Sequence, residues 1–262
     1  MKSSHKVALA MGFVVVACVV PGKGGAQSIA QQVRSAQDGK VRFAFAAKDG
    51  ICGHNNSIQH GNSSRHNWSN GSSSDVEYDI ECDADPVRVV LDVNDGKVTR
   101  LRTYVGGRWR PGSNVTDLGM ISTRAATDYL LALASEAEGK VAQEAIMPAT
   151  LADSVTVWPS LVKIARDDDR PNATRNQAMF WLSVQAGDRV DGNGDKSSGP
   201  DAEVKKSAVF ALSQQRQSES VSTLMEVARK NRDPDVRRTA LFWLGQTNDP
   251  RAVSLFEEIL SR

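Results

Sequence analysis

One five-residue pattern, Ala-x-Phe-x-Leu, occurs three times in the C-terminal half of the chain, at residues 178–182, 208–212 and 240–244. The alanines that open the copies are 30 and 32 residues apart. A period in this range is typical of stacked helical pairs, none of which can bury its apolar face alone. The pattern therefore predicts a helical repeat architecture for this half, but it identifies no ligand.

Within each copy, alanine and leucine at positions i and i+4 share one face of a helix, and phenylalanine lies on the opposite side. A helix that is apolar nearly all round must be covered on two sides, as the inner helix of a stacked pair is. We therefore expect the aromatic side chains of the pattern to pack in the core, with a hydrophobic ligand groove as the alternative. These side chains are Phe180, Trp181, Phe210, Phe242 and Trp243.

A basic residue stands three positions before each of the three alanines, and acidic residues precede it. Cations in the first turn of a helix oppose the helix dipole, so we expect neighbouring carboxylates to hold them in place. The alternative is a basic groove that binds an acidic partner. On that alternative the candidate partner-binding residues are Arg175, Lys205, Lys206, Arg237 and Arg238.

Residues 233–240 (Asp-Pro-Asp-Val-Arg-Arg-Thr-Ala) and 249–253 (Asp-Pro-Arg-Ala-Val), followed by Leu255 and Leu260, resemble bacterial HEAT-like repeats of the type also found in phycobilin lyases. The resemblance extends from about Trp158 to the C-terminus. It implies an α-solenoid of HEAT-like repeats with a protein-binding role. Exported chains of this kind resemble HEAT-repeat proteins of bacterial envelopes, some of which are associated with antibiotic-sensing metallopeptidase receptors.

The repeat is irregular between its first two copies. An outer helix should occupy residues 188–200, but this stretch is rich in Asp, Gly and Ser and cannot bury a helical face. We predict that this repeat has lost its outer helix, that 188–200 forms an irregular solvated loop, and that the inner-helix surface around Val184 is less covered than elsewhere.

The N-terminal half alternates apolar and polar residues with a period of two, the pattern of half-buried strands. Val41, Phe43 and Phe45 show it, and residues 76–80 show it again. Residues 87–93 and 98–105 are joined by Asn-Asp-Gly, a strong hairpin signal. The sequence therefore predicts an α+β fold in which a small antiparallel β domain precedes the helical repeats.

The predicted organisation has four parts. Because residues 53–75 are rich in Asn, Ser, Gly and His, we expect a mobile loop there, and from Ser122 onward the pattern is helical. The expected parts are a signal peptide at 1–26, a linker or short helix at 27–38, a disulfide-stapled β domain at 39–118 and the α-solenoid at 119–262.

The N-terminus has the features of a secretory signal. A short basic segment precedes an apolar run at 7–20, which is too short for a permanent membrane span, and small residues precede Gln27. We expect cleavage before Gln27 and a periplasmic or secreted protein without an integral membrane span. Alternatively, residues 15–18 act as a lipobox, so that Cys18 is lipidated and the protein is an envelope lipoprotein.

Cys52 and Cys82 are an even pair in a chain expected to reach an oxidising compartment. A disulfide between them is the default interpretation, and two free buried thiols are the alternative. Closing a loop of this length stabilises a fold by about 3 to 4 kcal/mol in the chain-entropy model.

Two groups of residues have weak metal-binding character. His54, His60 and His66 could bind zinc or copper, but their spacing of six matches no structural site. The second group is Asp191, Asn193 and Asp195. It has the spacing of a calcium loop, but the glycine and the glutamate that such a loop needs are missing. We favour no metal and no cofactor.

The charges are balanced, with 32 basic and 31 acidic residues interspersed along the chain. This gives no broad field for nucleic acid or an anionic membrane. No phosphate loop, dinucleotide fingerprint or nucleophile elbow is present, and the helical half contains no histidine for a catalytic triad.

We therefore expect a protein without catalysis of its own, an exported scaffold or adaptor whose partner is another envelope protein. One alternative is a regulatory or accessory subunit of an envelope sensing or proteolytic system. The other is a lyase-like chaperone for a chromophore or a metal.

Overall fold

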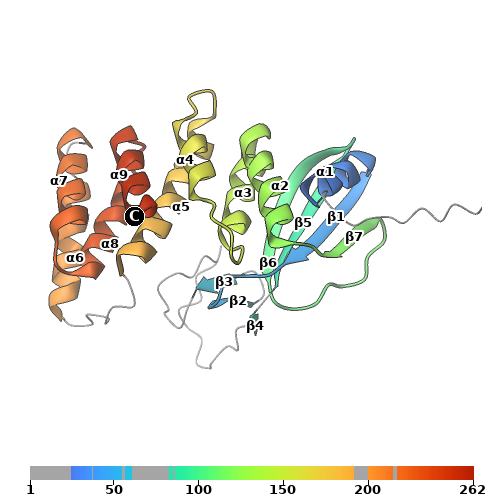
Figure 1. The fold of residues 1–262 in the computed structure, drawn as a ribbon, viewed down its shortest axis with the longest axis horizontal. Coiled ribbons are helices and arrows are strands. Elements are labelled where there is room, and N and C mark those ends of the chain that lie inside the picture. The colour runs from blue at the N-terminus through green and yellow to red at the C-terminus, as the bar shows by residue number, and fades with distance from the viewer. Residues whose placement is uncertain are drawn as a thin grey trace, which may run out of the picture.

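The computed structural model describes residues 25–36, 38–54, 57–60, 83–84, 86–191, 200–214 and 217–262. The larger sheet lies toward one end of the molecule, and helices extend from it in a row (Figure 1). This arrangement agrees with the expected α+β class. None of the described helices is long and apolar enough to cross a membrane.

The larger sheet has four strands in the order β6-β5-β1-β7. They are β1 (Asp38–Phe45), β5 (Val87–Asn94), β6 (Lys97–Val105) and β7 (Val115–Met120). The predicted hairpin is confirmed as β5 and β6, and its turn residues Asp95 and Gly96 both have positive φ. The prediction of a purely antiparallel sheet was wrong, because the chain crosses from β6 to the other edge and β7 then pairs with β1 in parallel.

One face of this sheet forms the core of the N-terminal half. Val41, Phe43 and Phe45 are fully buried, and the register places them opposite Leu91, Val89 and Val87. The helices that share this core are α1 (Gly25–Ser35), α2 (Thr123–Glu136) and α3 (Gly139–Thr150). Tyr129 of α2 meets Phe43 edge-on, with 6.3 Å between ring centroids, and Ser122 caps α2 where the helical pattern was expected to begin.

A second, smaller sheet has the order β3-β2-β4. Its strands are β2 (Ile51–His54), β3 (Ser57–His60) and β4 (Asp83–Ala84). Strands β2 and β3 thus occupy part of the segment expected to be a loop, and residues 61–82 lie outside the described residues. Cys52 pairs with Ala84 in the ladder. Because Cys82 is not among the described residues, the Cys52–Cys82 disulfide stays a prediction.

Six further helices form the C-terminal half. They are α4 (Trp158–Arg166), α5 (Asn172–Asp191), α6 (Pro200–Ser213), α7 (Gln217–Lys230), α8 (Pro234–Leu244) and α9 (Pro250–Ser261). The last two have the same start signal, a proline in the first turn preceded by a capping aspartate. The Asp233 and Asp249 carboxylates accept hydrogen bonds from the backbone N–H groups of Asp235 (3.0 Å) and Arg251 (2.9 Å).

The spatial order of these helices differs from their order in the chain. Helix α8 packs against both α5 and α6, and α9 packs against α4, α5 and α7. The α8–α9 segment therefore lies between α4–α5 and α6–α7 (Figure 1). Two rows result, an inner row α5-α8-α6 and an outer row α4-α9-α7.

The helices therefore do not stack in chain order. Helix α9 lies against α4 and α5. Two ion pairs tie α9 to the outer row on both sides, Arg166–Glu257 (2.7 Å) toward α4 and Arg229–Glu258 (3.0 Å) toward α7. Helix α5 continues to Asp191, and residues 192–199 of the predicted loop lie outside the described residues.

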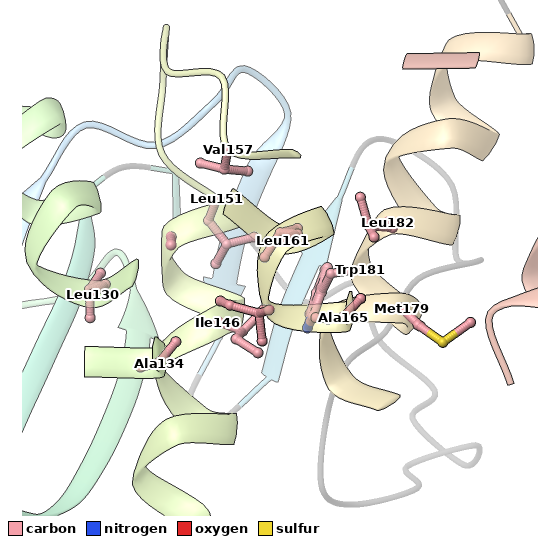
Figure 2. Packing of buried hydrophobic residues seen from close by; sticks show 14 of the residues in the cluster. Leu130, Ala134, Ile146, Leu151, Val157, Leu161, Ala165, Met179, Trp181 and Leu182 are labelled. Atoms are coloured by element: carbon pink, nitrogen blue, oxygen red, sulfur yellow. The ribbon is translucent and has the colours of Figure 1, made fainter. Parts of the chain in front are cut away.

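A single hydrophobic cluster runs from the sheet into the helical rows. Figure 2 shows its middle part, where Leu130 of α2, Ile146 of α3, Leu161 of α4 and Trp181 of α5 belong to the same cluster. The main chain also joins the two halves, because Lys48 donates its N–H to the Leu151 carbonyl oxygen at 2.9 Å.

Candidate functional site: an aromatic surface on the inner row

The three copies of the Ala-x-Phe-x-Leu pattern meet on the inner row. Phe180 of α5 contacts Phe242 of α8 edge-on, with 6.3 Å between ring centroids. Phe242 stands edge-on to Trp243 at 5.2 Å, and Trp243 contacts Phe210 of α6 at 5.1 Å. We call these four side chains, Phe180, Phe210, Phe242 and Trp243, the aromatic strip.

Much of the aromatic strip is open to solvent. Phe210 is 49% exposed and Phe242 is 40% exposed, while Trp181 beside them is buried at 3%. The expectation that all five aromatic side chains pack in the core was therefore wrong for Phe210 and Phe242. A single row of inner helices leaves the side opposite the alanine–leucine face uncovered, and phenylalanine at the third position of the pattern points to that side.

The alanine–leucine faces behave as expected only in the first and third copies. Ala178, Leu182, Ala240 and Leu244 are fully buried, because α5 and α8 have neighbours on both sides. In the second copy Ala208 is exposed, because α6 lies at the end of the inner row. The position of phenylalanine in the pattern indicated which side of each helix the rings occupy. No pattern in the sequence indicated the spatial order of the helices, which decides what covers each side.

Beside the aromatic strip, a hollow of ≈ 380 Å³ lies between α6 and α8. It is lined by Ser207, Phe210, Thr239, Phe242 and Trp243, none of which is charged. Its polar atoms are hydroxyls and an indole N–H, which can each form a hydrogen bond but cannot neutralise an ion. Contiguous exposed apolar area of this kind marks interaction sites. The surface suits an apolar, uncharged occupant.

The basic residues that precede the inner helices hold the ends of other helices. Arg237 donates to the carbonyl oxygens of Asn231 (2.9 Å) and Arg232 (3.0 Å), just past the end of α7, and to that of Val190 (2.9 Å) near the end of α5. Arg175 donates to the Ala165 carbonyl oxygen at the end of α4. A guanidinium at the C-terminal end of a helix satisfies open carbonyl groups and interacts favourably with the helix dipole.

Carboxylates also hold these bases, as the sequence suggested. Arg175 pairs with Asp168 at 3.0 Å, and Arg238 pairs with Asp188 at 3.6 Å. We interpret Arg175 and Arg237 as structural residues, because their donors already have partners inside the fold. The side chains of Lys205 and Lys206 lie outside the described part of the structure.

A second hollow, of ≈ 460 Å³, lies where α5, α7 and α9 end. Arg189, Arg229, Arg237 and Arg262 line it together with Glu258. Glu258 pairs with both Arg229 and Arg262. The hydrogen bond from Arg229 is the main reason that the pKa of Glu258 lies below its usual range. Arg229 and Arg262 thus share Glu258, and Arg237 is held by helix ends.

Lys48 lies at the junction of the two halves. Burial lowers the pKa of its ammonium group, and the nearby carboxylates of Asp188 and Asp153 oppose that shift. Asp188 also pairs with Arg238. This junction joins the β domain to α5 electrostatically.

No group of three or more His, Cys, Asp or Glu side chains that could hold a metal occurs among the residues that the structure describes. His66, Asn193 and Asp195 lie outside those residues, as do the side chains of His54, His60 and Asp191. The weak metal candidates from the sequence are therefore not tested. Residues 1–24, which include Cys18 and most of the predicted signal peptide, also lie outside the described residues.

Comparison with known families gives a match for the last four helices. Residues 196–262 match the family of HEAT repeats. The match spans α6 to α9, and it supports a HEAT-repeat protein and a helical repeat scaffold for protein interaction. Comparison with curated proteins and with solved structures gave no match.

Proposed function

We propose that the protein is an exported scaffold that binds an apolar segment of another protein on the aromatic strip and performs no catalysis of its own. The observation that carries this proposal is the continuous ring contact from Phe180 through Phe242 and Trp243 to Phe210, in which Phe210 and Phe242 are exposed. Phenylalanine and tryptophan rings at such a surface supply large apolar area at little cost in conformational entropy.

The chemistry of the partner follows from the lining. Because Ser207 and Thr239 are the polar neighbours, charged side chains would find no counter-ion on the strip. The outer row differs in that charged side chains join its helices: α9 forms ion pairs with both α4 and α7. An amphipathic helix or an extended segment with two or three large apolar side chains fits the strip, in the manner of helix-in-groove recognition.

Site-specific photo-crosslinking in the native cell envelope tests the proposal. A photoreactive phenylalanine analogue at position 242 should form a discrete adduct with one protein, identified by mass spectrometry. The same analogue at Lys163, which is exposed on α4 in the outer row, should not form it. Excess unlabelled wild-type protein should suppress the adduct, and excess F210A/F242A protein should not.

Equal adducts from positions 242 and 163, or suppression by both competitors, would contradict the proposal. Export is tested separately by the mass of the mature N-terminus. Cleavage before Gln27 supports a soluble periplasmic or secreted protein, and a lipidated Cys18 supports an envelope lipoprotein. A scaffold that regulates an envelope sensing or proteolytic system predicts that loss of the chain changes an activity that the purified protein lacks.

A further inference from the structure

The four-stranded sheet has a second face, opposite the core, on which basic residues gather. The strand register aligns Lys40 and Arg100 on either side of Asp92, and Arg42 and Arg102 on either side of Val90. Arg88 lies on the same face, between Ala44 and Tyr104. We call this surface, together with the segment 106–114 that crosses it, the basic face.

Part of the positive charge on the basic face is used within the fold. Arg42 pairs with Asp117 at 2.8 Å, and Arg102 pairs with Asp92 at 2.6 Å. Arg88 donates to the carbonyl oxygens of Gly106 and Gly107, at 2.8 Å each. The guanidinium groups of Arg42 and Arg88 also lie 5.1 and 5.2 Å from the ring centre of Trp109. These contacts fix the crossing segment against the sheet.

The remaining cations have no such partner. Lys40, Arg100, Arg108 and Arg110 are exposed, and within the described residues they form no ion pair or side-chain hydrogen bond. The acidic side chains of this face are Asp92 and Asp117, both already paired, and Asp38 at the exposed start of β1. The basic face therefore keeps a local excess of positive charge in a chain whose formal net charge is only +1.

We propose that the basic face binds an extended, acidic polypeptide segment. Guanidinium groups bind carboxylates through paired N–H donors, and Asp117 and Asp92 show that carboxylates already bind arginines on this face. The unpartnered cations Lys40 and Arg100 lie on either side of Asp92, two strand spacings or about 10 Å apart. Carboxylates of an extended acidic segment that crosses the strands can reach both.

Two other anionic partners fit less well. Proteins that bind single-stranded nucleic acid combine a basic groove with free aromatic rings on which bases stack. Here the Tyr104 and Trp109 rings meet edge-on at 6.4 Å, and Trp109 also contacts two guanidinium groups. A membrane surface is bound most firmly where apolar side chains insert beside the basic residues. Met120 is the single large apolar side chain counted as exposed among the described residues of the β domain.

The test uses the full chain and a fluorescein-labelled peptide of alternating glutamate and serine, with fluorescence anisotropy at low salt. The test variant is Arg100→Glu with Arg108→Glu. The matched control is Arg124→Glu with Lys163→Glu, which makes the same change in net charge at exposed positions on α2 and α4. We expect the test variant to bind the peptide at least about tenfold more weakly and the control to change by less than about twofold. Circular dichroism checks that all variants fold.

Three results would overturn the proposal. The first is no binding of the glutamate peptide beyond that of a glutamine–serine peptide. The second is an equal loss in both variants, which would indicate net charge alone. The third is a larger effect of Arg100 and Arg108 on an oligothymidine strand, or on vesicles containing phosphatidylglycerol, than on the peptide. Because the basic face is separate from the aromatic strip, F210A/F242A protein should bind the peptide as the wild type does.

Discussion

Arg166 of α4 and Glu257 of α9 form an ion pair of 2.7 Å, although α5, α6, α7 and α8 separate them in the chain. The residue that follows Glu257, Glu258, pairs with Arg229 of α7. Adjacent glutamates thus connect α9 to both of its neighbours in the outer row. The same holds in the inner row, where Phe242 contacts α5 and Trp243 contacts α6.

A double-mutant cycle on Arg166 and Glu257 tests this order of helices. Both side chains are about two-fifths exposed, so we expect a coupling of about 0.2–1 kcal/mol in the free energy of unfolding. Urea denaturation of Arg166→Ala, Glu257→Ala and the double variant measures it. The cycle of Arg166 with Glu258 serves as the control and should show no coupling. Coupling in the control alone would mean that α9 lies elsewhere.

Replacement of Gly245 by alanine should destabilise the contact between α8 and α5. A Cβ atom at this position would lie 2.6 Å from the Ser183 Cβ. The backbone there is helical, with φ of −62°, so alanine suits the backbone and the loss comes from the clash. We expect a loss of about 1–3 kcal/mol in the free energy of unfolding, measured by urea denaturation. Alanine at the adjacent exposed Gln246 should change it little.

The Asp249 cap should give a pH-dependent contribution to stability. The hydrogen bond from the Arg251 side chain is the main reason that the pKa of Asp249 lies below its usual range. A carboxyl whose pKa is lowered by folding stabilises the fold above its unfolded pKa, and this contribution is lost as pH falls through the folded pKa.

Asp249→Ala should therefore cost about 0.5–2 kcal/mol at neutral pH, and less when the carboxyl is protonated in acid. Asp249→Asn keeps a capping oxygen and should retain part of the stability at neutral pH. Thermal unfolding at several pH values checks this. A cost that stays constant down to the most acidic pH at which the protein folds would contradict it.

Arg237 should prove structural and not partner-binding. Its guanidinium donates to three carbonyl oxygens from two helix ends. We expect Arg237→Ala to lower the free energy of unfolding by about 1.5–3 kcal/mol, and Arg237→Lys to recover only part, because an ammonium group cannot reproduce the planar set of donors. Lys163→Ala is the control. Unchanged stability together with a lost crosslink at position 242 would assign Arg237 to the partner instead.

The aromatic strip should bind the apolar dye 8-anilinonaphthalene-1-sulfonate. Phe210→Ser with Phe242→Ser should reduce the dye's fluorescence several-fold, because these two rings supply most of the exposed apolar area of the strip. Met120→Ser is the matched control, since Met120 is 61% exposed but belongs to another part of the molecule. An equal reduction in both variants would show that the dye does not report on the strip.

Local patterns in the sequence predicted individual elements well. Alternation at Val41, Phe43 and Phe45 identified β1, and Asn94-Asp95-Gly96 identified the β5–β6 hairpin, because both signals depend on neighbouring residues. The parallel β7 was missed because strand partners that are far apart in the chain leave no local pattern.

The exposure of the aromatic strip could be predicted only in part. The sequence showed that phenylalanine lies on the side of the helix opposite Ala178 and Leu182. It did not show whether another helix covers that side. What covers a face depends on which helix packs next to it, and the placement of α8 between α5 and α6 is set by long-range packing. The basic face could not be predicted from the sequence either. Its cations come from β1, β5, β6 and the crossing segment, and only the register of the sheet brings them together.

The position of α9 between α4 and α7 has a consequence for the time course of folding. A ribosome releases α4 and α5 well before α8 and α9, yet those late helices are the neighbours that cover them. Helices α3 and α4 cover part of α5 early, but the side of α5 that packs on α8 and α9 waits uncovered while α6 and α7 are synthesised. Repeats that stack in chain order can fold as they emerge. Here the middle of the array closes only after α8 and α9 have emerged.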